Sequence, residues 1–144
     1  MKIALACDHA GYELKLLLKD YLEKKGHKIT DLGAFSPDSS DYPDFAHPLA
    51  EAIEQKKCDV GFSMCGSGNG ISITANKHAN IRSALCWNKE VARLARQHND
   101  ANICALPSRF ILPELAIEII DVFLSTEFEG GRHKRRIDKI PIKK

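Results

Sequence analysis

Strand-like and helix-like stretches alternate along almost the whole chain, and this alternation limits the possible folds more than any other feature. Five short apolar runs are typical of buried strands: residues 2–7, 27–32, 58–64, 81–86 and 102–106. Helical signals separate these runs at 14–25, 44–57, 71–75 and 88–97, and a last helix is expected at 113–124. Repeated strand–helix units form parallel sheets whose crossovers place helices on both faces. The sequence therefore predicts an α/β fold, a three-layer α/β/α sandwich around a Rossmann-like, mainly parallel, five-stranded sheet.

The apolar residues of the helices predict which helix faces are buried. In the first helix they recur at helical spacing before Gly26, at Leu14, Leu17, Leu18, Tyr21 and Leu22. In the last helix the expected buried face consists of Leu115, Ile119, Val122 and Phe123. Pro48 lies within the predicted helix 44–57 and is tolerable there only near the first turn, because proline has no N–H.

The length of 144 residues is sufficient for one domain with a full hydrophobic core, so we expect a single domain over residues 1–144. No apolar run approaches the roughly 20 residues of a membrane span. The apolar run 3–7 is also too short for a signal-peptide core, which favours a cytoplasmic protein without a membrane partner. The five cysteines are scattered and form no CxxC pair, so neither a zinc site nor a disulfide framework is indicated.

Positive charge is concentrated at the end of the chain. Residues 132–144 contain seven lysines and arginines and one aspartate, while the whole chain carries a net charge of only +2. Such a tail can be a solvated end, a nucleic-acid arm or a phosphate clamp. Because no aromatic residues are interleaved with the charges, we expect no nucleic-acid partner. Arg132 and Arg136 are four residues apart and would share one face of a helix, where two guanidiniums suit a phosphate monoester.

The segment Cys65-Gly-Ser-Gly-Asn-Gly-Ile-Ser72 follows a strand-like run and precedes a helix-like one. Its glycines allow a tight turn that aims several backbone N–H groups at one point before the helix. This point favours negative charge, either a phosphate or an oxyanion that develops in a reaction, and it favours the thiolate of Cys65. From these residues alone, a reactive cysteine and a buried cysteine beside a turn remain equally good interpretations.

Three familiar phosphate or nucleotide motifs are excluded in this segment. The loop lacks the G-x-G-x-x-G spacing of a dinucleotide-binding turn, and the chain has no G-x-x-x-x-G-K-[ST] loop. A cysteine phosphatase would need an arginine six residues after the cysteine, where this chain has Ile71.

Ligands of parallel sheets bind beyond the carboxyl ends of the strands, where the strand order reverses. Three polar segments follow predicted strands and should meet at this edge: Asp8-His9, Cys65–Gly70 and Ser108-Arg109. Tyr42 in the loop 33–43 and His98 in the polar run 96–102 are further candidates. Each of these two is also compatible with an ordinary solvated position.

Taken together, six ordered motifs resemble the ribose-5-phosphate isomerase B family, which includes allose-6-phosphate and galactose-6-phosphate isomerases. They are Cys7-Asp-His-Ala-Gly11, Asp41-Tyr-Pro43, the 65–72 segment with Ala75-Asn-Lys77, Arg96-Gln-His-Asn-Asp-Ala-Asn102, Ser108-Arg109 and Glu129-Gly-Gly-Arg-His133. The resemblance implies an aldose–ketose isomerase that interconverts D-ribose 5-phosphate and D-ribulose 5-phosphate through a cis-enediol(ate), without metal or cofactor. It also implies a homodimer, which can pair into a tetramer, with the site at the subunit interface.

The resemblance also implies roles for individual residues. Cys65 would be the base, His98 would open the furanose ring, and Ser67 would keep a hydroxyl where relatives often have threonine. The implied substrate-binding residues are Asp8, His9, Tyr42, Gly66, Gly68, Asn69, Gly70, Asn99, Arg109, Arg132 and Arg136. Among them, His9 and the three arginines would clamp the phosphate, and Asp8 and Tyr42 would contact sugar hydroxyls.

Two positions depart from the usual pattern of that family, Asn69 in the glycine loop and Asn80 before the fourth strand. Asparagine tolerates left-handed backbone, so neither change argues against the fold. His98 favours a ribose-5-phosphate enzyme over the galactose-6-phosphate branch. Three alternatives remain open at this point: an isomerase of allose 6-phosphate or another six-carbon phosphosugar, a non-catalytic sugar-phosphate-binding module, and a cysteine redox protein.

Overall fold

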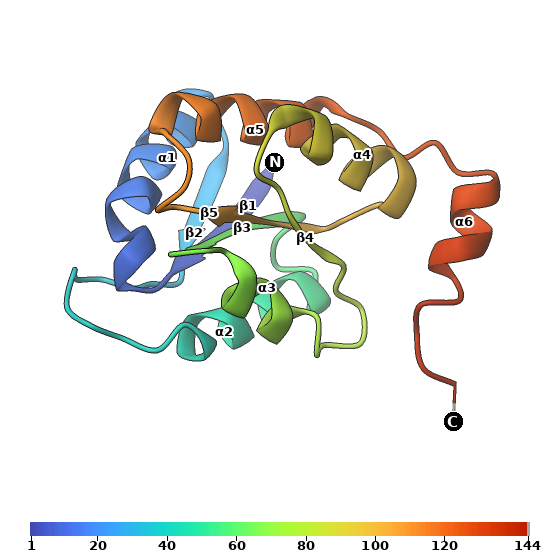
Figure 1. Cartoon of the computed structure of the whole chain (residues 1–144), viewed down its shortest axis with the longest axis horizontal. Coiled ribbons are helices and arrows are strands. Elements are labelled where there is room, and N and C mark those ends of the chain that lie inside the picture. The colour runs from blue at the N-terminus through green and yellow to red at the C-terminus, as the bar shows by residue number, and fades with distance from the viewer. Residues whose placement is uncertain (144) are drawn as a thin grey trace.

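The computed structural model describes residues 1–143 and contains one five-stranded sheet in which all neighbouring strands are parallel (Figure 1). The strands are β1 (Lys2–Cys7), β2 (Lys28–Asp31), β3 (Val60–Cys65), β4 (Ser83–Leu85) and β5 (Ile103–Pro107). Their order across the sheet is β2-β1-β3-β5-β4. The predicted α/β sheet is therefore confirmed, and the strand order reverses between β1 and β3.

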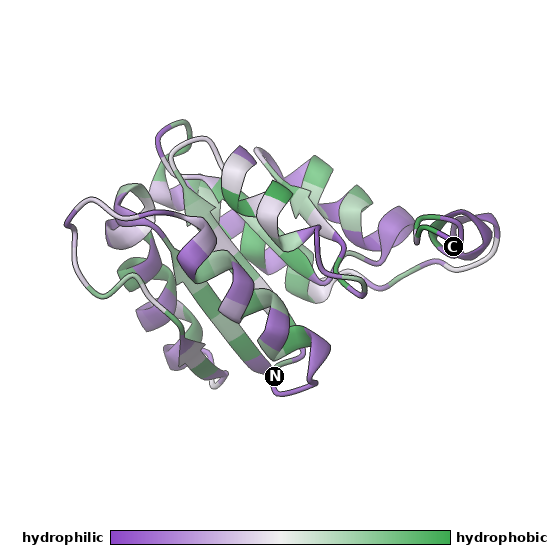
Figure 2. Cartoon of the chain, turned by 90° about the horizontal axis from the view of Figure 1, so that it is seen from below, coloured by the Kyte–Doolittle hydropathy of each residue, from purple (hydrophilic) through white to green (hydrophobic). Residues whose placement is uncertain are grey.

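Helices cover both faces of this sheet and give the predicted three layers (Figure 1). They are α1 (Tyr12–Lys24), α2 (Pro43–Glu54), α3 (Asn69–Ala75), α4 (Lys89–Asn99), α5 (Pro113–Ser125) and α6 (Arg132–Ile137), with a short 3₁₀ turn η1 at His9–Gly11. Helices α1, α4 and α5 pack on one face, and α2 and α3 pack on the other. Helix α6 lies beyond the end of α4, away from the sheet, and most of its residues are hydrophilic (Figures 1 and 2).

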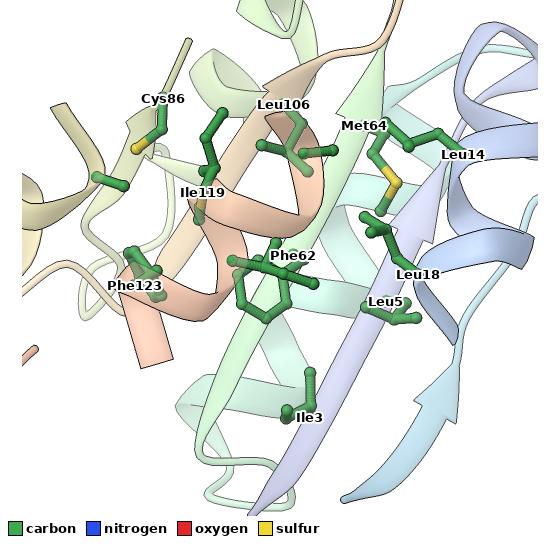
Figure 3. Packing of buried hydrophobic residues seen from close by; sticks show 14 of the residues in the cluster. Ile3, Leu5, Leu14, Leu18, Phe62, Met64, Cys86, Leu106, Ile119 and Phe123 are labelled. Carbon is green, nitrogen blue, oxygen red and sulfur yellow. The ribbon is translucent and has the colours of Figure 1, made fainter. Parts of the chain in front are cut away.

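The alternation of side chains along β1 explains how one strand serves two cores. Ile3 and Leu5 are fully buried on the face covered by α1 and α5 (Figure 3). Ala4 and Ala6 are fully buried against α2 on the other face. Successive side chains of a strand point to opposite faces, so a strand buried on both faces needs apolar residues at every position. The uninterrupted apolar run of β1 is the sequence signature of this central location.

Aromatic packing joins β3 to the last long helix. Phe62 and Phe123 are fully buried, and their rings meet edge to face with 5.5 Å between the centroids (Figure 3). This arrangement suits the ring quadrupoles and adds about 1 kcal/mol to the stabilisation from burial.

The buried helix faces differ from two predictions. In α1, Leu17 is 38% exposed, and Lys15 is fully buried in its place. In α5, Leu115 and Val122 are only half-buried, while Ala116 and Ile120 are fully buried with Ile119 and Phe123. The buried face of α5 is centred one residue further along the chain than predicted. It includes Ala116 because a small alanine side chain lets the helix pack more closely on the sheet than a leucine would. Lys15 is buried because its ammonium group finds partners inside the protein, which a count of apolar residues does not detect.

The expectation for Pro48 is also wrong. Helix α2 begins at Pro43 and ends at Glu54, so Pro48 lies in the second turn and not in the first. Its missing N–H costs one helical hydrogen bond to the carbonyl of Asp44. The helix continues because Ala46, Leu49 and Ile53 bury its other side against the sheet.

Candidate active site

The carboxyl ends of β1, β3 and β5 are tied together at the point where the strand order reverses. The Asp8 N–H donates to the Met64 carbonyl at 3.2 Å. The Ser108 hydroxyl oxygen lies 2.9 Å from the carbonyl oxygens of both Cys65 and Ala10, and its single hydrogen can donate to either of them. These bonds hold the three segments that follow the strands in one rigid group, at the location where parallel sheets bind ligands.

An open pocket of about 520 Å³ lies at this edge. Its walls are formed by Asp8, Tyr42, Cys65, Gly66, Ser67, Gly70, Arg109 and Phe110. Seven of these eight residues were candidates from the sequence, and only Phe110 was missed. Phe110 is 76% exposed and directly follows Ser108-Arg109. An aromatic residue next to a polar strand end is the feature of the sequence that could have identified it as a pocket residue.

Two glycines give the cysteine loop its shape. Gly68 has a φ of 77°, and a Cβ there would lie 2.4 Å from the Leu85 side chain and 3.1 Å from the backbone of Leu106. Gly70 lies under the ring of Tyr42, so that a Cβ there would come within 2.4 Å of the ring. Gly68 therefore permits the left-handed turn, whereas Gly70 permits the close approach of Tyr42.

The loop presents unused backbone donors to the pocket. Within residues 1–143, the N–H groups of Gly66, Ser67 and Gly70 have no hydrogen-bond acceptor. The Ser67 hydroxyl oxygen accepts from the Asn69 N–H at 3.2 Å, which leaves the hydroxyl hydrogen free to donate. Such donors, fixed before a reaction begins, can stabilise an anion or a developing oxyanion.

Asp8 and His9 are held in place by short local contacts. Asp8 is buried, and its Oδ1 accepts from the Ala10 N–H at 2.9 Å at the start of η1. Nδ1 of His9 accepts from the Ser40 N–H at 3.2 Å. The same Nδ1 lies 3.3 Å from the Ser40 carbonyl oxygen, so the contact with Ser40 suits either neutral tautomer. In the tautomer that accepts from the Ser40 N–H, Nε2 carries the hydrogen and can donate to a ligand. Ser40, which the sequence did not single out, fixes this ring through its backbone.

Four other candidates lie at the opposite edge of the sheet. His98 and Asn99 end α4, before β5 begins, whereas Cys65 pairs with Pro107 at the far end of β5. The five residues of β5 separate these edges by about 13 Å. Arg132 and Arg136 lie in α6, which contacts α4 and extends away from the sheet (Figure 1). One chain therefore does not bring these four residues to Cys65.

The residues at this second edge form a group of their own. The rings of His98 and His133 are stacked, with 4.1 Å between their centroids and 9° between their planes. Burial lowers the pKa of His133, and the neighbouring His98 and Arg132 lower it further, although Glu129 opposes them. Arg132 and Arg136 are exposed. Arg109 is the one proposed phosphate-binding arginine that lines the Cys65 pocket.

The other cysteines have no chemical role that the structure supports. All five are free thiols and are buried, but of the five only Cys65 lines the pocket at the sheet edge. Burial raises the pKa of Cys7 to about 11 and raises that of Cys104 as well. Thiols with raised pKa values remain protonated at neutral pH and are poor nucleophiles.

Comparison with known proteins assigns the family. Residues 3–140 match the family described as Ribose/Galactose Isomerase. Ribose-5-phosphate isomerase B of Escherichia coli is 43% identical over 139 residues, which cover 96% of this chain and 93% of that protein. No helix of residues 1–143 is long and apolar enough to cross a membrane.

Solved structures give the same result. A ribose 5-phosphate isomerase of Thermotoga maritima is 52% identical with a TM-score of 0.96, and the match covers 97% of each chain. Ribose-5-phosphate isomerase B of Mycoplasma genitalium, solved with bound ribulose-5-phosphate, is 42% identical with a TM-score of 0.94 and coverage of 96% and 93%. The motifs, the fold and these similarities agree, and the chain belongs to the ribose/galactose isomerase family.

Proposed function

We propose that this chain is an isomerase that interconverts D-ribose 5-phosphate and D-ribulose 5-phosphate through a cis-enediol(ate). The observation that carries the proposal is the location of Cys65 in a pocket lined by unused backbone donors. The relative from Mycoplasma genitalium, which shares this fold at 42% identity, was solved with ribulose-5-phosphate. Residues 1–144 would act as one isomerase domain, and the free thiols support a reducing, cytoplasmic location.

The proposed chemistry needs one base that moves a proton between C1 and C2 of the open sugar. Cys65, as a thiolate, would take the proton from C2 of the aldose and return it to C1, while the proton of the O2 hydroxyl passes to O1 and C2 becomes the carbonyl carbon of the ketose. The oxygen at C1 gains negative charge as the enediolate forms. The N–H groups of Gly66, Ser67 and Gly70 would hold this oxygen, and one such donor can be worth roughly 3 kcal/mol.

The remaining roles concern binding and ring opening. Asp8 and Tyr42 line the pocket and would bind sugar hydroxyls. His9 would donate from Nε2, and Arg109 would pair with the phosphate by charge-assisted hydrogen bonds. His98 would open the furanose ring by exchanging a proton with the ring oxygen, a task suited to an imidazole, which can both donate and accept a proton.

His98 can take part only if a second copy of the chain supplies it. In one chain His98, Asn99, Arg132 and Arg136 lie at the edge of the sheet opposite to Cys65. We therefore propose a homodimer in which the end of α4 and helix α6 of one protomer reach the Cys65 pocket of its partner. A two-fold axis makes this exchange reciprocal, so each dimer would contain two complete sites. Pairing of such dimers would give a tetramer.

The experiment that tests the function is ribose 5-phosphate turnover in the presence of EDTA. Wild type should be active, and Cys65→Ala should lose at least about a hundredfold in kcat, the usual contribution of a general base. Cys58→Ala is the matched control, because it removes another buried thiol that lies outside the pocket. Equal activity of Cys65→Ala and Cys58→Ala would remove Cys65 from the chemistry.

The same assay with allose 6-phosphate separates the pentose from the hexose assignment. If kcat/KM is higher for allose 6-phosphate than for ribose 5-phosphate, the substrate is the six-carbon sugar, and the proposed mechanism is unchanged. Binding of both sugars without turnover would favour a non-catalytic sugar-phosphate-binding module.

A further inference from the structure

Three side chains that can bind a metal ion meet where the end of α4 lies against α6. One ligand atom from each of His98, Glu129 and His133 lies within 4.8 Å of the other two. The backbone supports the group, because the Glu129 N–H donates to the Gln97 carbonyl at 3.1 Å, directly before His98. We propose that this cluster is a binding site for Zn²⁺, with two imidazoles and one carboxylate as ligands.

His133 provides the observation that points to a ligand. Its side chain is buried, with 5% of the residue exposed, and its Nε2 has no hydrogen-bond partner within residues 1–143. Glu129 Oε2 lies 3.4 Å from this nitrogen, outside hydrogen-bond geometry. A buried polar atom without a partner costs free energy, because it has given up its hydrogen bonds to water. A bound metal ion would satisfy this nitrogen and would use the carboxylate beside it.

The distance between His133 and Glu129 suits a small tetrahedral ion. Zinc binds imidazole nitrogen and carboxylate oxygen at about 2.0–2.2 Å, so two ligand atoms of a tetrahedral site are about 3.3 Å apart. The 3.4 Å between His133 Nε2 and Glu129 Oε2 already matches this spacing. His98 is stacked almost parallel to His133, so its ring would have to tilt to direct a lone pair at the same ion. The fourth position would remain open to water.

The ligand types select the metal. Two imidazoles and a carboxylate favour zinc and other late first-row divalent ions over Mg²⁺ and Ca²⁺, which prefer oxygen ligands. The chain has another close pair, His47 and His78, but these rings share a 2.8 Å contact and His78 also contacts Glu54 at 2.7 Å. Because the histidines of this second pair already have hydrogen-bonding partners, we expect them not to bind zinc. A substitution in this pair is therefore a control for the proposed site.

Zinc at this cluster would inhibit the enzyme and would not assist it. The ion would hold His98 by the nitrogen lone pair, and His98 could then no longer exchange a proton with the sugar ring. This consequence rests on the proposed function, whereas the binding site itself does not. Zinc and substrate would therefore compete for the same cluster of side chains.

The first test measures metal binding directly, by calorimetry with Zn²⁺ and by the visible spectrum with Co²⁺ as a tetrahedral probe. Glu129→Ala is the informative variant, because half of the Glu129 side chain is exposed and its loss should not disturb folding. Glu127→Ala and His47→Ala are the controls. We expect wild type and both controls to bind one ion per chain, and Glu129→Ala to bind at least about tenfold more weakly.

Cys65 is the competing site, since thiolates also bind zinc. Cys65→Ala should keep the binding constant of wild type, and the Co²⁺ complex of wild type should show no thiolate charge-transfer band. Loss of binding in Cys65→Ala, or equal affinity of wild type and Glu129→Ala, would overturn the proposed site.

The second test measures inhibition in buffer without chelator. Without zinc, Glu129→Ala should isomerise ribose 5-phosphate as fast as wild type, and it should need at least about tenfold more Zn²⁺ for half-inhibition. Equal inhibition of both proteins would overturn the inhibitory role. If zinc-free wild type shows no isomerase activity, the proposed function fails, and the binding test still decides the metal site.

Discussion

The ring of Tyr42 lies directly over Gly70, so close that a Cβ at Gly70 would be 2.4 Å from Tyr42 Cζ. This contact links the start of α2 to the cysteine loop, two segments that are separated in sequence but line the same pocket. The lack of a side chain at Gly70 thus allows the Tyr42 ring to lie against the cysteine loop.

Gly70→Ala should displace the Tyr42 ring and lower kcat/KM for ribose 5-phosphate by roughly ten- to a hundredfold, because small misplacements of binding groups have effects of this size. Gly70 has no positive φ, so helix content measured by circular dichroism should stay unchanged.

Tyr42→Ala provides the control for this prediction through a double-mutant cycle. If the methyl group acts by displacing the ring, Gly70→Ala should have little further effect in the Tyr42→Ala background. Additive losses in kcat/KM would mean that the methyl group obstructs the substrate itself.

The separation of His98 from Cys65 leads to a mixing experiment. Cys65→Ala and His98→Gln should each be inactive as pure dimers, because each lacks one contribution to both sites. After unfolding and refolding of an equal mixture, half of the dimers contain one chain of each kind. Each mixed dimer has one site with both residues intact, so activity should return to about a quarter of wild type.

The return or absence of activity in the refolded mixture decides whether Cys65 and His98 act across the subunit interface or within one chain. If both residues acted within one chain, every site of the mixture would lack either the thiol or the imidazole, and no activity would return. The comparison needs only the two variants, their refolded mixture and wild type refolded in the same way.

The location of the pocket could be predicted because strand direction alone determines it. In a parallel sheet every strand ends at the same edge, so Asp8, Cys65 and Arg109 had to come together once their strands were recognised. The location of His98 followed the same rule, since a residue before β5 must lie at the other edge. Only the resemblance to a family indicated that a second chain would bring these edges together.

Contacts between side chains from distant segments could not be predicted in this way. The stack of His98 on His133 depends on where the segment after α5 places α6 against the end of α4, which no periodicity encodes. The burial of Lys15 was missed for a different reason. A pattern of apolar residues counts lysine as exposed, but the ammonium group of this lysine has partners inside the protein.

Lys15 should contribute strongly to stability. Its side chain is fully buried, and Nζ donates to Asp31 Oδ1 at 2.6 Å and to the Ala34 carbonyl at 2.5 Å. Lys15→Met preserves much of the volume but leaves the Asp31 carboxylate without its main partner. Removal of one member of such a pair costs about 3–5 kcal/mol, which urea unfolding would measure as a lower midpoint.

Lys19→Met is the matched control for Lys15. Lys19 Nζ lies 3.8 Å from the same carboxylate, but its side chain is 37% exposed, so its loss should cost less than about 1 kcal/mol. Adding Asp31→Asn to Lys15→Met should recover part of the lost stability, because the unpaired charge is then removed. A double variant less stable than Lys15→Met would contradict this explanation.

Cys7 should make the stability of the folded protein sensitive to alkaline pH. Burial raises the pKa of its thiol from an ordinary value of 9.0 to about 11, although the ammonium of Lys15 opposes this shift. Between these two pH values the unfolded thiol loses its proton while the folded thiol keeps it. The stabilisation is therefore complete below pH 9 and is lost as the pH rises toward 11.

Urea unfolding of wild type and Cys7→Ala at pH 8.0 and at pH 10.5 would measure this effect, the pH values being chosen on either side of about 9. The variant loses packing at both pH values, but it should lose less stability than wild type when the pH is raised. Lysines and tyrosines that titrate in this range affect both proteins equally and cancel in the comparison. If raising the pH lowers the free energy of unfolding equally in the two proteins, the Cys7 thiol ionises as readily in the folded chain as in the unfolded one.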